Sequence, residues 1–430
     1  MVKEMSHPVI KEDIKTIASN LGELIKKFEG KTVLITGGAG ALGKYLVLTI
    51  DYLNQHLLGK PCKMIILDNF ITGLEGVLEE NEHTKIIKQD ISKPFAIDGS
   101  IDYIMHAASI AAPLFYKKFP METIDVGFLG TKNILEIARQ KKVESFLFFS
   151  TSEVYGNPTP ENIPTPETYF GNVSCFGPRA SYDEPKRIGE TLCMTYADLY
   201  NIPVKIVRPF NVYGPGMRLD DGRGAINFAV AALKGEKIPV YGDGKNTRTW
   251  TYVSDATTAF FQVLLSEHNR EIYNVGSDEQ EIEMRHLAQL FAGLVKDGTT
   301  EIHNIEGPNE AYSKADVNRR CPDLTKIRTT LGYQPRVSLV AGLRRFIQWV
   351  EYALKEQKNA FGLQTKCRIC DNADLKLVIS LGKSPLANSL LSENELSKQE
   401  ETFPLEMVYC DNCKLCQLSY VVNPKEMFSN

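Results

Sequence analysis

Long hydrophobic runs are absent from this sequence of 430 residues. No apolar stretch approaches the roughly 18 residues that a membrane-spanning helix requires, and pieces such as Ser145–Phe149 are much shorter. The first residues also lack the apolar core of a signal peptide, because MVKEMSHPVIKEDIKTI places acidic side chains there. We therefore expect a cytoplasmic protein with reduced thiols that does not associate with membranes.

An excess of charge of either sign is also absent. The 49 lysine and arginine residues stand against 53 aspartate and glutamate residues, which gives a formal net charge of -4. Binding to nucleic acid would require a local basic patch, so we expect no nucleic-acid partner. The hydrophobic fraction of 43% and the charged fraction of 24% are ordinary for a globular protein, which excludes wholesale disorder and a coiled coil.

Residues 1–30 predict an amphipathic leading helix. Ile10, Ile14 and Leu21 recur at helical spacing, with Ser6 as the expected cap and Pro8 as the first-turn proline. This helix is neither long nor strongly basic, so we expect it to pack on its own domain or on a dimer mate.

From residue 31 onward, short apolar runs alternate with helical patterns. KTVLITGG predicts a strand, residues 41–58 a helix, and KMIILDN a second strand. Runs this continuous are typical of strands buried on both faces of a parallel sheet. We predict an α/β fold with a doubly wound, Rossmann-type parallel sheet. Further strands are expected at residues 85–88, 102–105, 145–149 and 204–207, with a helix over 122–140.

Turn signals and composition divide the rest of the chain. Residues 210–350 contain GPG, GDG and NVGS and predict a smaller substrate lobe within a domain that spans 31–355. Residues 356–366 are rich in lysine and glutamine and read as a linker, and 367–430 form a separate module.

A glycine-rich turn follows the first predicted strand. Gly37, Gly40 and Gly43 stand at the start of the first helix, where small residues let a pyrophosphate approach backbone N–H groups. Asp68 ends the second strand and would accept hydrogen bonds from the adenosine ribose while repelling a 2′-phosphate. The pattern therefore predicts NAD rather than NADP. The remaining residues predicted at this cofactor site are Asn69, Asp90, Ile91, Tyr182 and Lys186.

A second constellation points to alcohol chemistry. Tyr182 and Lys186 form Y-x-x-x-K on one helix face, and the lysine is expected to lower the pKa of the phenol so that it can take a proton from an alcohol. Thr151 and Glu153 follow a strand that should end at the ligand-binding edge of the sheet. Thr151 would share the hydrogen bond to the alcohol, and Glu153 would orient the substrate or move a proton.

Five of the nine cysteines lie beyond residue 366. Cys367-x-x-Cys370 and Cys410-x-x-Cys413 have the spacing of a four-cysteine zinc site, and Zn²⁺ is the expected metal. Cys416 is a fifth sulfur, expected to be either a spare buried thiol or a replacement for Cys413.

The glycine pattern, STSEVYG, YDEPK and RPFNVYGPG together resemble the extended short-chain dehydrogenase/reductase family. Within it, GPRASYDEPKR, DDGRGAINF, YGDGKNTRTWTYVSD and NRRCPD are most similar to UDP-glucuronate decarboxylases. This resemblance implies a homodimer that oxidises C4 of a nucleotide-linked uronic acid with NAD and then loses carbon dioxide. The implied catalytic residues are Thr151, Glu153, Tyr182, Lys186 and Arg320. The implied substrate-binding residues are Arg179, Asn211, Arg223, Tyr241 and Arg248.

Related reactions differ at a few positions. A 4,6-dehydratase needs an acid beside the glutamate, where this sequence has Ser152, and a 4-epimerase would not need Arg320. The sequence departs from the family at Ala41, often a bulky aromatic residue, and at Gly127, where an asparagine commonly supports the tyrosine. Gly127 leaves two outcomes open: a complete cycle to UDP-xylose, or release of a 4-keto pentose with NADH.

The cysteine-rich module resembles the N-terminal zinc-binding domain of sugar C-methyltransferases. A 4-keto group acidifies the C3 proton and so permits carbon methylation, which implies a methyltransferase domain or partner that uses the keto sugar. A different class of function also stays open, a scaffold in which the zinc module binds a partner. The residues around the knuckles mix both charges, which disfavours binding to nucleic acid.

Overall fold

The computed structural model describes residues 3–295, 300–306, 317–359, 362–370, 372–386 and 400–423. The chain forms two compact units, Met1–Glu351 and Tyr352–Asn430. Among the described helices, none combines the length and apolar character needed to cross a membrane.

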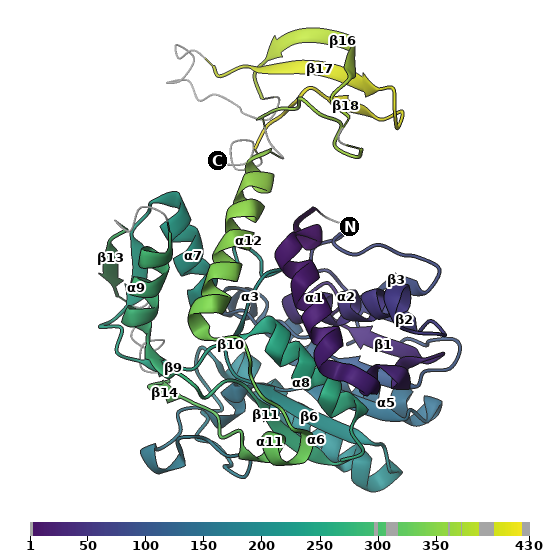
Figure 1. The fold of residues 1–430 in the computed structure, drawn as a ribbon, viewed down its shortest axis with the longest axis vertical. Coiled ribbons are helices and arrows are strands. Elements are labelled where there is room, and N and C mark those ends of the chain that lie inside the picture. The colour runs from purple at the N-terminus through teal and green to yellow at the C-terminus, as the bar shows by residue number, and fades with distance from the viewer. Residues whose placement is uncertain are drawn as a thin grey trace. The chain divides into compact units, whose positions relative to one another are not determined.

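A seven-stranded parallel sheet organises the first unit (Figure 1). Its order is β11-β6-β5-β4-β1-β2-β3, so the strand sequence reverses between β1 and β4, as in a doubly wound fold. The predicted fold class is confirmed. The strands are β1 (Thr32–Thr36), β2 (Lys63–Asp68), β3 (Thr84–Lys88), β4 (Tyr103–His106), β5 (Ser145–Phe149), β6 (Val204–Pro209) and β11 (Glu271–Val275).

Two helical layers bury the sheet. One consists of α1 (Pro8–Leu21), α2 (Ala41–His56) and α8 (Val253–Leu265), which pack on one another (Figure 1). The other includes α3 (Pro113–Lys118), α4 (Pro120–Asp125), α5 (Thr131–Lys141) and α6 (Ala180–Tyr200). The side chains of β1, β4, β5 and β6 are almost all buried, which explains why these strands read as continuous apolar runs.

Two predicted helices differ in detail. The leading helix ends at Leu21, and a 3₁₀ helix continues to Phe28. The N-cap of the leading helix is His7, whose Nδ1 accepts a hydrogen bond from Val9 N at 3.3 Å, so the assignment of Ser6 as cap is wrong. The helix expected over 122–140 is interrupted by a π-helical turn, Val126–Gly130, between α4 and α5. Its two glycines have low helix propensity.

Short elements build the substrate lobe and the end of the first unit. Three small sheets pair β7 with β10, β8 with β13, and β9 with β12 and β14. The bounds are η4 (Ser152–Tyr155), η5 (Pro160–Asn162), β7 (Val212–Tyr213), α7 (Gly224–Lys234), β8 (Ile238–Tyr241), β9 (Thr247–Arg248), β10 (Thr251–Tyr252), β12 (Ile282–Glu283), α9 (Met284–Leu294), β13 (Ile302–Ile305), β14 (Arg319–Arg320), α11 (Thr325–Leu331) and α12 (Leu339–Asn359).

The second unit is built from short antiparallel pairs. A three-stranded sheet has the order β16-β17-β18, and β15 pairs with β19. The bounds are β15 (Gly362–Leu363), β16 (Leu375–Ser384), β17 (Phe403–Cys410), β18 (Cys416–Leu418) and β19 (Tyr420–Val421).

A buried carboxylate fastens α1 to the rest of the first unit. Asp13 is 1% exposed; its Oδ2 accepts hydrogen bonds from the hydroxyls of Tyr45 at 2.8 Å and Tyr252 at 2.9 Å. Arg345 Nη2 donates to Oδ1 at 2.7 Å. The leading helix is thereby joined to α2, β10 and α12. Because α2 begins at the glycine turn, this cluster also fixes the helix that borders the cofactor site.

We expect Asp13→Ala to lower the free energy of unfolding of the first unit by about 3 kcal/mol, because two buried hydroxyls and a guanidinium lose their acceptor. Both tryptophans of the chain, Trp250 and Trp349, lie in this unit, so their fluorescence in urea reports its unfolding. Lys11→Ala, an exposed change on the same helix, is the control. Equal midpoints for the two variants would contradict the role given to Asp13.

Candidate active site and cysteine cluster

A cavity of about 710 Å³ involves the carboxyl ends of the central strands. It contains the residues that the sequence assigned to three separate tasks. The cofactor residues that line it are Gly37, Gly40, Gly43, Asp68, Asn69, Asp90 and Ile91. The predicted catalytic residues that line it are Thr151, Glu153, Tyr182, Lys186 and Arg320, and the predicted substrate residues are Arg179, Asn211, Arg223, Tyr241 and Arg248.

The glycine turn is tight enough to exclude side chains. Gly37 has φ +72°, and a Cβ there would lie 2.7 Å from the Cα of Ala108. A Cβ at Gly43 would lie 2.1 Å from the carbonyl oxygen of Gly37. Gly40 precedes the first residue of α2 and provides no side-chain cap. The first N–H groups of the helix therefore suit an anion such as the diphosphate of NAD.

Asp68 lies at the end of β2 and is held by backbone amides. Its Oδ2 accepts from Ala39 N at 2.9 Å and its Oδ1 from Phe70 N at 2.8 Å. Burial raises the pKa of Asp68, whereas these two hydrogen bonds act to lower it. The carboxylate borders the cavity, where its remaining lone pairs suit ribose hydroxyls. The glycine turn and Asp68 together fit NAD.

Tyr182 and Lys186 lie on the buried face of α6, where burial is the largest influence on the pKa of each. Burial raises the pKa of Tyr182 to about 12, although a hydrogen bond with Thr151 and the nearby Arg223 lower it. Lys186 Nζ instead donates to the carbonyl of Phe149 at 2.6 Å, and burial lowers the pKa of Lys186 to about 8. Thr151 and Arg223 are the groups that lower the pKa of Tyr182 here, and the expectation that Lys186 does so stays a prediction.

Glu153 is enclosed by two guanidiniums. Arg320 binds it in a fork, with Nη1 to Oε1 at 2.7 Å and Nη2 to Oε2 at 2.6 Å, and Arg179 Nη2 also contacts Oε2. Burial alone would raise the pKa of Glu153, but the two arginines outweigh it and lower the pKa to about 2. Glu153 is therefore a fixed anion at neutral pH, which favours an orienting role over proton transfer.

The predicted substrate residues supply further positive charge. Arg223 precedes α7 and pairs with Asp221, with Nη2 to Oδ2 at 2.7 Å. Arg248 is 7% exposed and its Nη1 donates to the carbonyl of Thr247 at 2.8 Å. Asn211 Nδ2 donates to the carbonyl of Thr249 at 2.9 Å, and Tyr241 is half exposed at the end of β8. Together with Arg179 and Arg320, these guanidiniums suit an anionic ligand.

Sequence reasoning missed two buried residues beside Tyr182. Tyr116 on α3 stacks on Tyr182, with 5.4 Å between ring centroids and 9° between planes. Asp183 is buried beside Arg179 at 3.7 Å, and burial raises its pKa to about 7. No motif includes Tyr116, whereas Asp183 sits inside YDEPK next to the tyrosine and was open to recognition.

Glu190 was also missed, although it continues the four-residue spacing of Tyr182 and Lys186. It accepts hydrogen bonds from Arg208 at 2.8 and 2.6 Å and from the hydroxyl of Ser150. Because Ser150 directly precedes Thr151, this buried cluster fixes the loop of Thr151 against α6.

Steric crowding explains why position 127 is occupied by glycine in this chain. It lies in the π-helical turn, and a Cβ added to it would lie 2.4 Å from the Cβ of Pro185 on α6. An asparagine therefore cannot occupy this position while Pro185 is present without a shift of one element.

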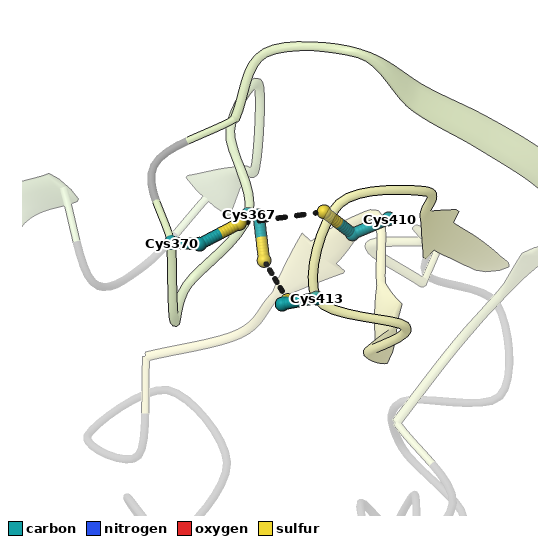
Figure 2. A group of neighbouring side chains, drawn as sticks. All are labelled: Cys367, Cys370, Cys410 and Cys413. Carbon is teal, nitrogen blue, oxygen red and sulfur yellow. Dashed lines mark hydrogen bonds between the residues drawn. The ribbon is translucent and has the colours of Figure 1, made fainter.

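The four predicted zinc ligands lie together in the second unit. Figure 2 shows their side chains converging from two turns. The Sγ atoms of Cys367 and Cys413 are 3.3 Å apart, and those of Cys370 and Cys410 are 3.5 Å apart. All four sulfurs lie within 4.8 Å of one another. Tetrahedral Zn²⁺ with bonds of about 2.3 Å separates its sulfurs by about 3.8 Å, so the cluster fits zinc. Cys416 is exposed and outside this group, so its expected burial is wrong.

The chain matches two family models. Residues 33–276 match the NAD dependent epimerase/dehydratase family. Residues 367–428 match a zinc binding domain family whose model is named after methyltransferases.

Curated relatives extend the first match. UDP-glucuronic acid decarboxylase 2 of Arabidopsis thaliana is 39% identical over 348 residues, which cover 79% of this chain and 74% of the relative. UDP-glucuronic acid decarboxylase 1 of Danio rerio is 35% identical over 340 residues, covering 78% of this chain and 77% of the relative.

Solved structures share the fold of the first unit. The epimerase Mth375 of Methanothermobacter thermautotrophicus has a TM-score of 0.66 at 26% identity and covers 82% of this chain and 99% of its own. The dTDP-glucose 4,6-dehydratase DesIV of Streptomyces venezuelae, solved with NAD bound, has a TM-score of 0.65 at 23% identity and covers 76% and 98%. From the cavity, the glycine turn and these matches, the chain belongs to the NAD dependent epimerase/dehydratase family, in the branch of the UDP-glucuronic acid decarboxylases.

Proposed function

We propose that the first unit decarboxylates UDP-glucuronate with NAD as its resident cofactor. The observation that carries the proposal is Arg320, which reaches the catalytic cavity beside Glu153. Among the described residues, no hydrogen-bond partner exists for its buried Nε. A guanidinium with a donor to spare suits the carboxylate of a uronic acid. The names and identities of the relatives support the same substrate.

The reaction begins with oxidation at C4 of the sugar. Tyr182 takes the proton of the C4 hydroxyl while Thr151, hydrogen-bonded to Tyr182, orients it. Bound NAD supplies a hydride acceptor for C4 and a positive charge that favours the ionised form of a nearby phenol. The product of this step is a β-keto acid.

Loss of carbon dioxide follows from that product. The bond between C5 and the carboxyl carbon breaks, its electron pair moves into the C4 carbonyl as an enolate, and C5 then takes up a proton. Arg320 positions the carboxylate, and Tyr182 and Thr151 hold the developing oxygen anion. Return of the hydride to C4 and of the proton from Tyr182 completes the cycle to UDP-xylose; without it the product is the 4-keto pentose.

The same geometry disfavours a 4,6-dehydratase. Elimination of water needs an acid to protonate the leaving hydroxyl. Ser152 is 3% exposed and has no acidic proton near neutral pH, and the pKa of Glu153, lowered to about 2 by the two arginines against burial, leaves it ionised. An epimerase would need no group in the position of Arg320.

Purified protein with NAD and UDP-glucuronate should release carbon dioxide and form UDP-xylose or the hydrated 4-keto pentose. An NMR time course of the reaction measures these products. We expect Tyr182→Phe to reduce turnover at least about 100-fold, because the proton acceptor is lost. Tyr200→Phe, an exposed change on the same helix, should leave the rate unchanged.

Arg320→Lys serves as a second variant in this experiment, since lysine keeps the charge but not the fork to Glu153. It should slow decarboxylation more than it weakens binding of UDP. Formation of a 4-keto-6-deoxy sugar from UDP-glucose or dTDP-glucose, without turnover of UDP-glucuronate, would replace the proposal with a dehydratase.

We further propose that the second unit holds one structural Zn²⁺ and links the chain to a sugar C-methyltransferase. The support is the four-sulfur cluster and the family model matched by residues 367–428. A 4-keto sugar is a suitable substrate for such an enzyme because the keto group acidifies the C3 proton. Four unpaired ligand thiols also agree with the reducing cytoplasm, where we place the protein.

Metal analysis of the purified chain should find about one zinc ion per chain. Cys410→Ser should abolish zinc binding, because it removes one of the four ligands. Cys416→Ser, at the start of β18, is the matched control and should retain the metal. Full zinc occupancy in the Cys410 variant would show that the cluster is not the binding site.

We propose a homodimer formed by α4, the π-helical turn and α6. These elements pack on one another and expose several apolar side chains. They include Met121 (63%), Ile124 (37%), Phe128 (40%), Leu129 (39%), Ile188 (38%) and Leu199 (66%). Exposed apolar side chains on packed elements are a feature of subunit interfaces, and this supports the proposal.

Light scattering should therefore give twice the monomer mass, and Met121→Asp should shift the protein to the monomer by burying a charge at the interface. Leu57→Asp at the end of α2, on the other helical layer, should leave the mass unchanged. A monomeric wild-type protein would contradict the assignment.

A further inference from the structure

The segment from Gly214 to Arg223 is tied to the cofactor half of the cavity at two points. Lys44 Nζ on α2 donates a hydrogen bond to the carbonyl of Gly216 at 2.5 Å. Arg218 Nη1 donates to the carbonyl of Thr72 at 3.0 Å. All four residues line the cavity.

Lys44 makes the first tie from within the protein interior. It is 4% exposed, in the first turn of α2, and comes four residues after Gly40. Burial raises the pKa of Asp68, and the Lys44 ammonium is among the groups that oppose this rise, which places its charge close to that carboxylate. A buried ammonium that donates to a backbone carbonyl makes a charge-assisted hydrogen bond, stronger than a neutral one.

Arg218 makes the second tie and is itself held in three ways. Besides Thr72, its Nε and Nη2 donate to the carboxylate of Asp220, each at 2.8 Å. Its guanidinium also lies over the ring of Phe115, 5.0 Å from the centroid. The side chain is therefore ordered before any ligand binds, so little entropy is lost in maintaining the bond to Thr72.

Both ties end on the part of the wall that fits NAD. Lys44 follows the glycine turn on α2, and Thr72 follows Asp68 after β2. The other end of the segment carries Arg223, which precedes α7 and is a predicted ligand of the substrate diphosphate. One stretch of ten residues thus connects the cofactor wall with the substrate lobe.

We propose that Gly214–Arg223 is a strap, closed by Lys44 and Arg218, that retains NAD(H) in the cavity between oxidation and reduction of the sugar. Retention decides which product forms, and this part of the inference rests on the proposed decarboxylation. When NADH stays, its hydride returns to C4 and Tyr182 returns the proton, so UDP-xylose forms and NAD is regenerated. When NADH leaves, one NAD is reduced for each carbon dioxide lost and the 4-keto pentose is released.

The test measures dissociation of NADH without any sugar nucleotide. Full-length protein loaded with NADH is mixed with excess NAD in a stopped-flow instrument, and the fluorescence of bound NADH gives the dissociation rate. Loss of one charge-assisted hydrogen bond should accelerate dissociation about tenfold in Lys44→Met and in Arg218→Ala. Arg328→Ala is the matched control, since Arg328 is also partly exposed and binds one carboxylate, Asp278, with two nitrogens.

Arg218→Lys separates the strap from a general loss of structure. It can still donate to the carbonyl of Thr72 and should bring the dissociation rate back toward that of the wild type. Folded Lys44 and Arg218 variants that release NADH at the wild-type rate would overturn the proposal, as would equal acceleration in the Arg328 control.

Products provide a second readout. With UDP-glucuronate, the two strap variants should form more 4-keto pentose and NADH relative to UDP-xylose than the wild type does. A protein that does not act on UDP-glucuronate would refute the proposed function but leave the NADH dissociation rates, and thus the strap, to be judged on their own.

Discussion

The ion pair between Glu153 and two arginines is the interaction on which the arrangement of the site depends. Glu153 follows β5, Arg179 precedes α6, and Arg320 lies in β14, so one carboxylate joins the parallel sheet, the helix that carries Tyr182 and the substrate lobe. Three buried charges this close are stable only as a set, because removing one leaves the others unpaired. The same pairing keeps the carboxylate ionised, so the reaction depends on how charge is placed more than on an acid supplied by the protein.

The cofactor half of the site was readable from the sequence because its signals are local. A strand, the turn around Gly37 and a helix follow one another directly, and Asp68 closes the next strand. Each requirement is steric or electrostatic and involves residues within a short span. The four zinc ligands could also be predicted from local spacing, because each C-x-x-C turn specifies the geometry of one pair of ligands. The parallel sheet was equally predictable, because strands buried on both faces appear in the sequence as continuous apolar runs.

The substrate half depends on contacts between distant residues, and there the sequence was less informative. Glu153 and Arg320 are 167 positions apart, and neither motif predicts that the guanidinium binds the carboxylate through two nitrogens. Tyr116 stacks on Tyr182 through chain topology alone. The raised pKa of Tyr182 likewise reflects burial, which the Y-x-x-x-K pattern does not encode. Spacing shows which residues share a helix face, whereas pKa values depend on everything packed around that face.

Gly127 and Pro185 constrain each other across the contact between the π-helical turn and α6. Their Cβ positions would be 2.4 Å apart if Gly127 carried a side chain. The contact involves the Cβ of residue 185, which every amino acid except glycine carries, so replacing the proline by another such residue would not by itself make room. A side chain at position 127 therefore requires the π-helical turn to move away from α6. The absent side chain of Gly127 thus sets how closely the turn can approach the helix that carries Tyr182.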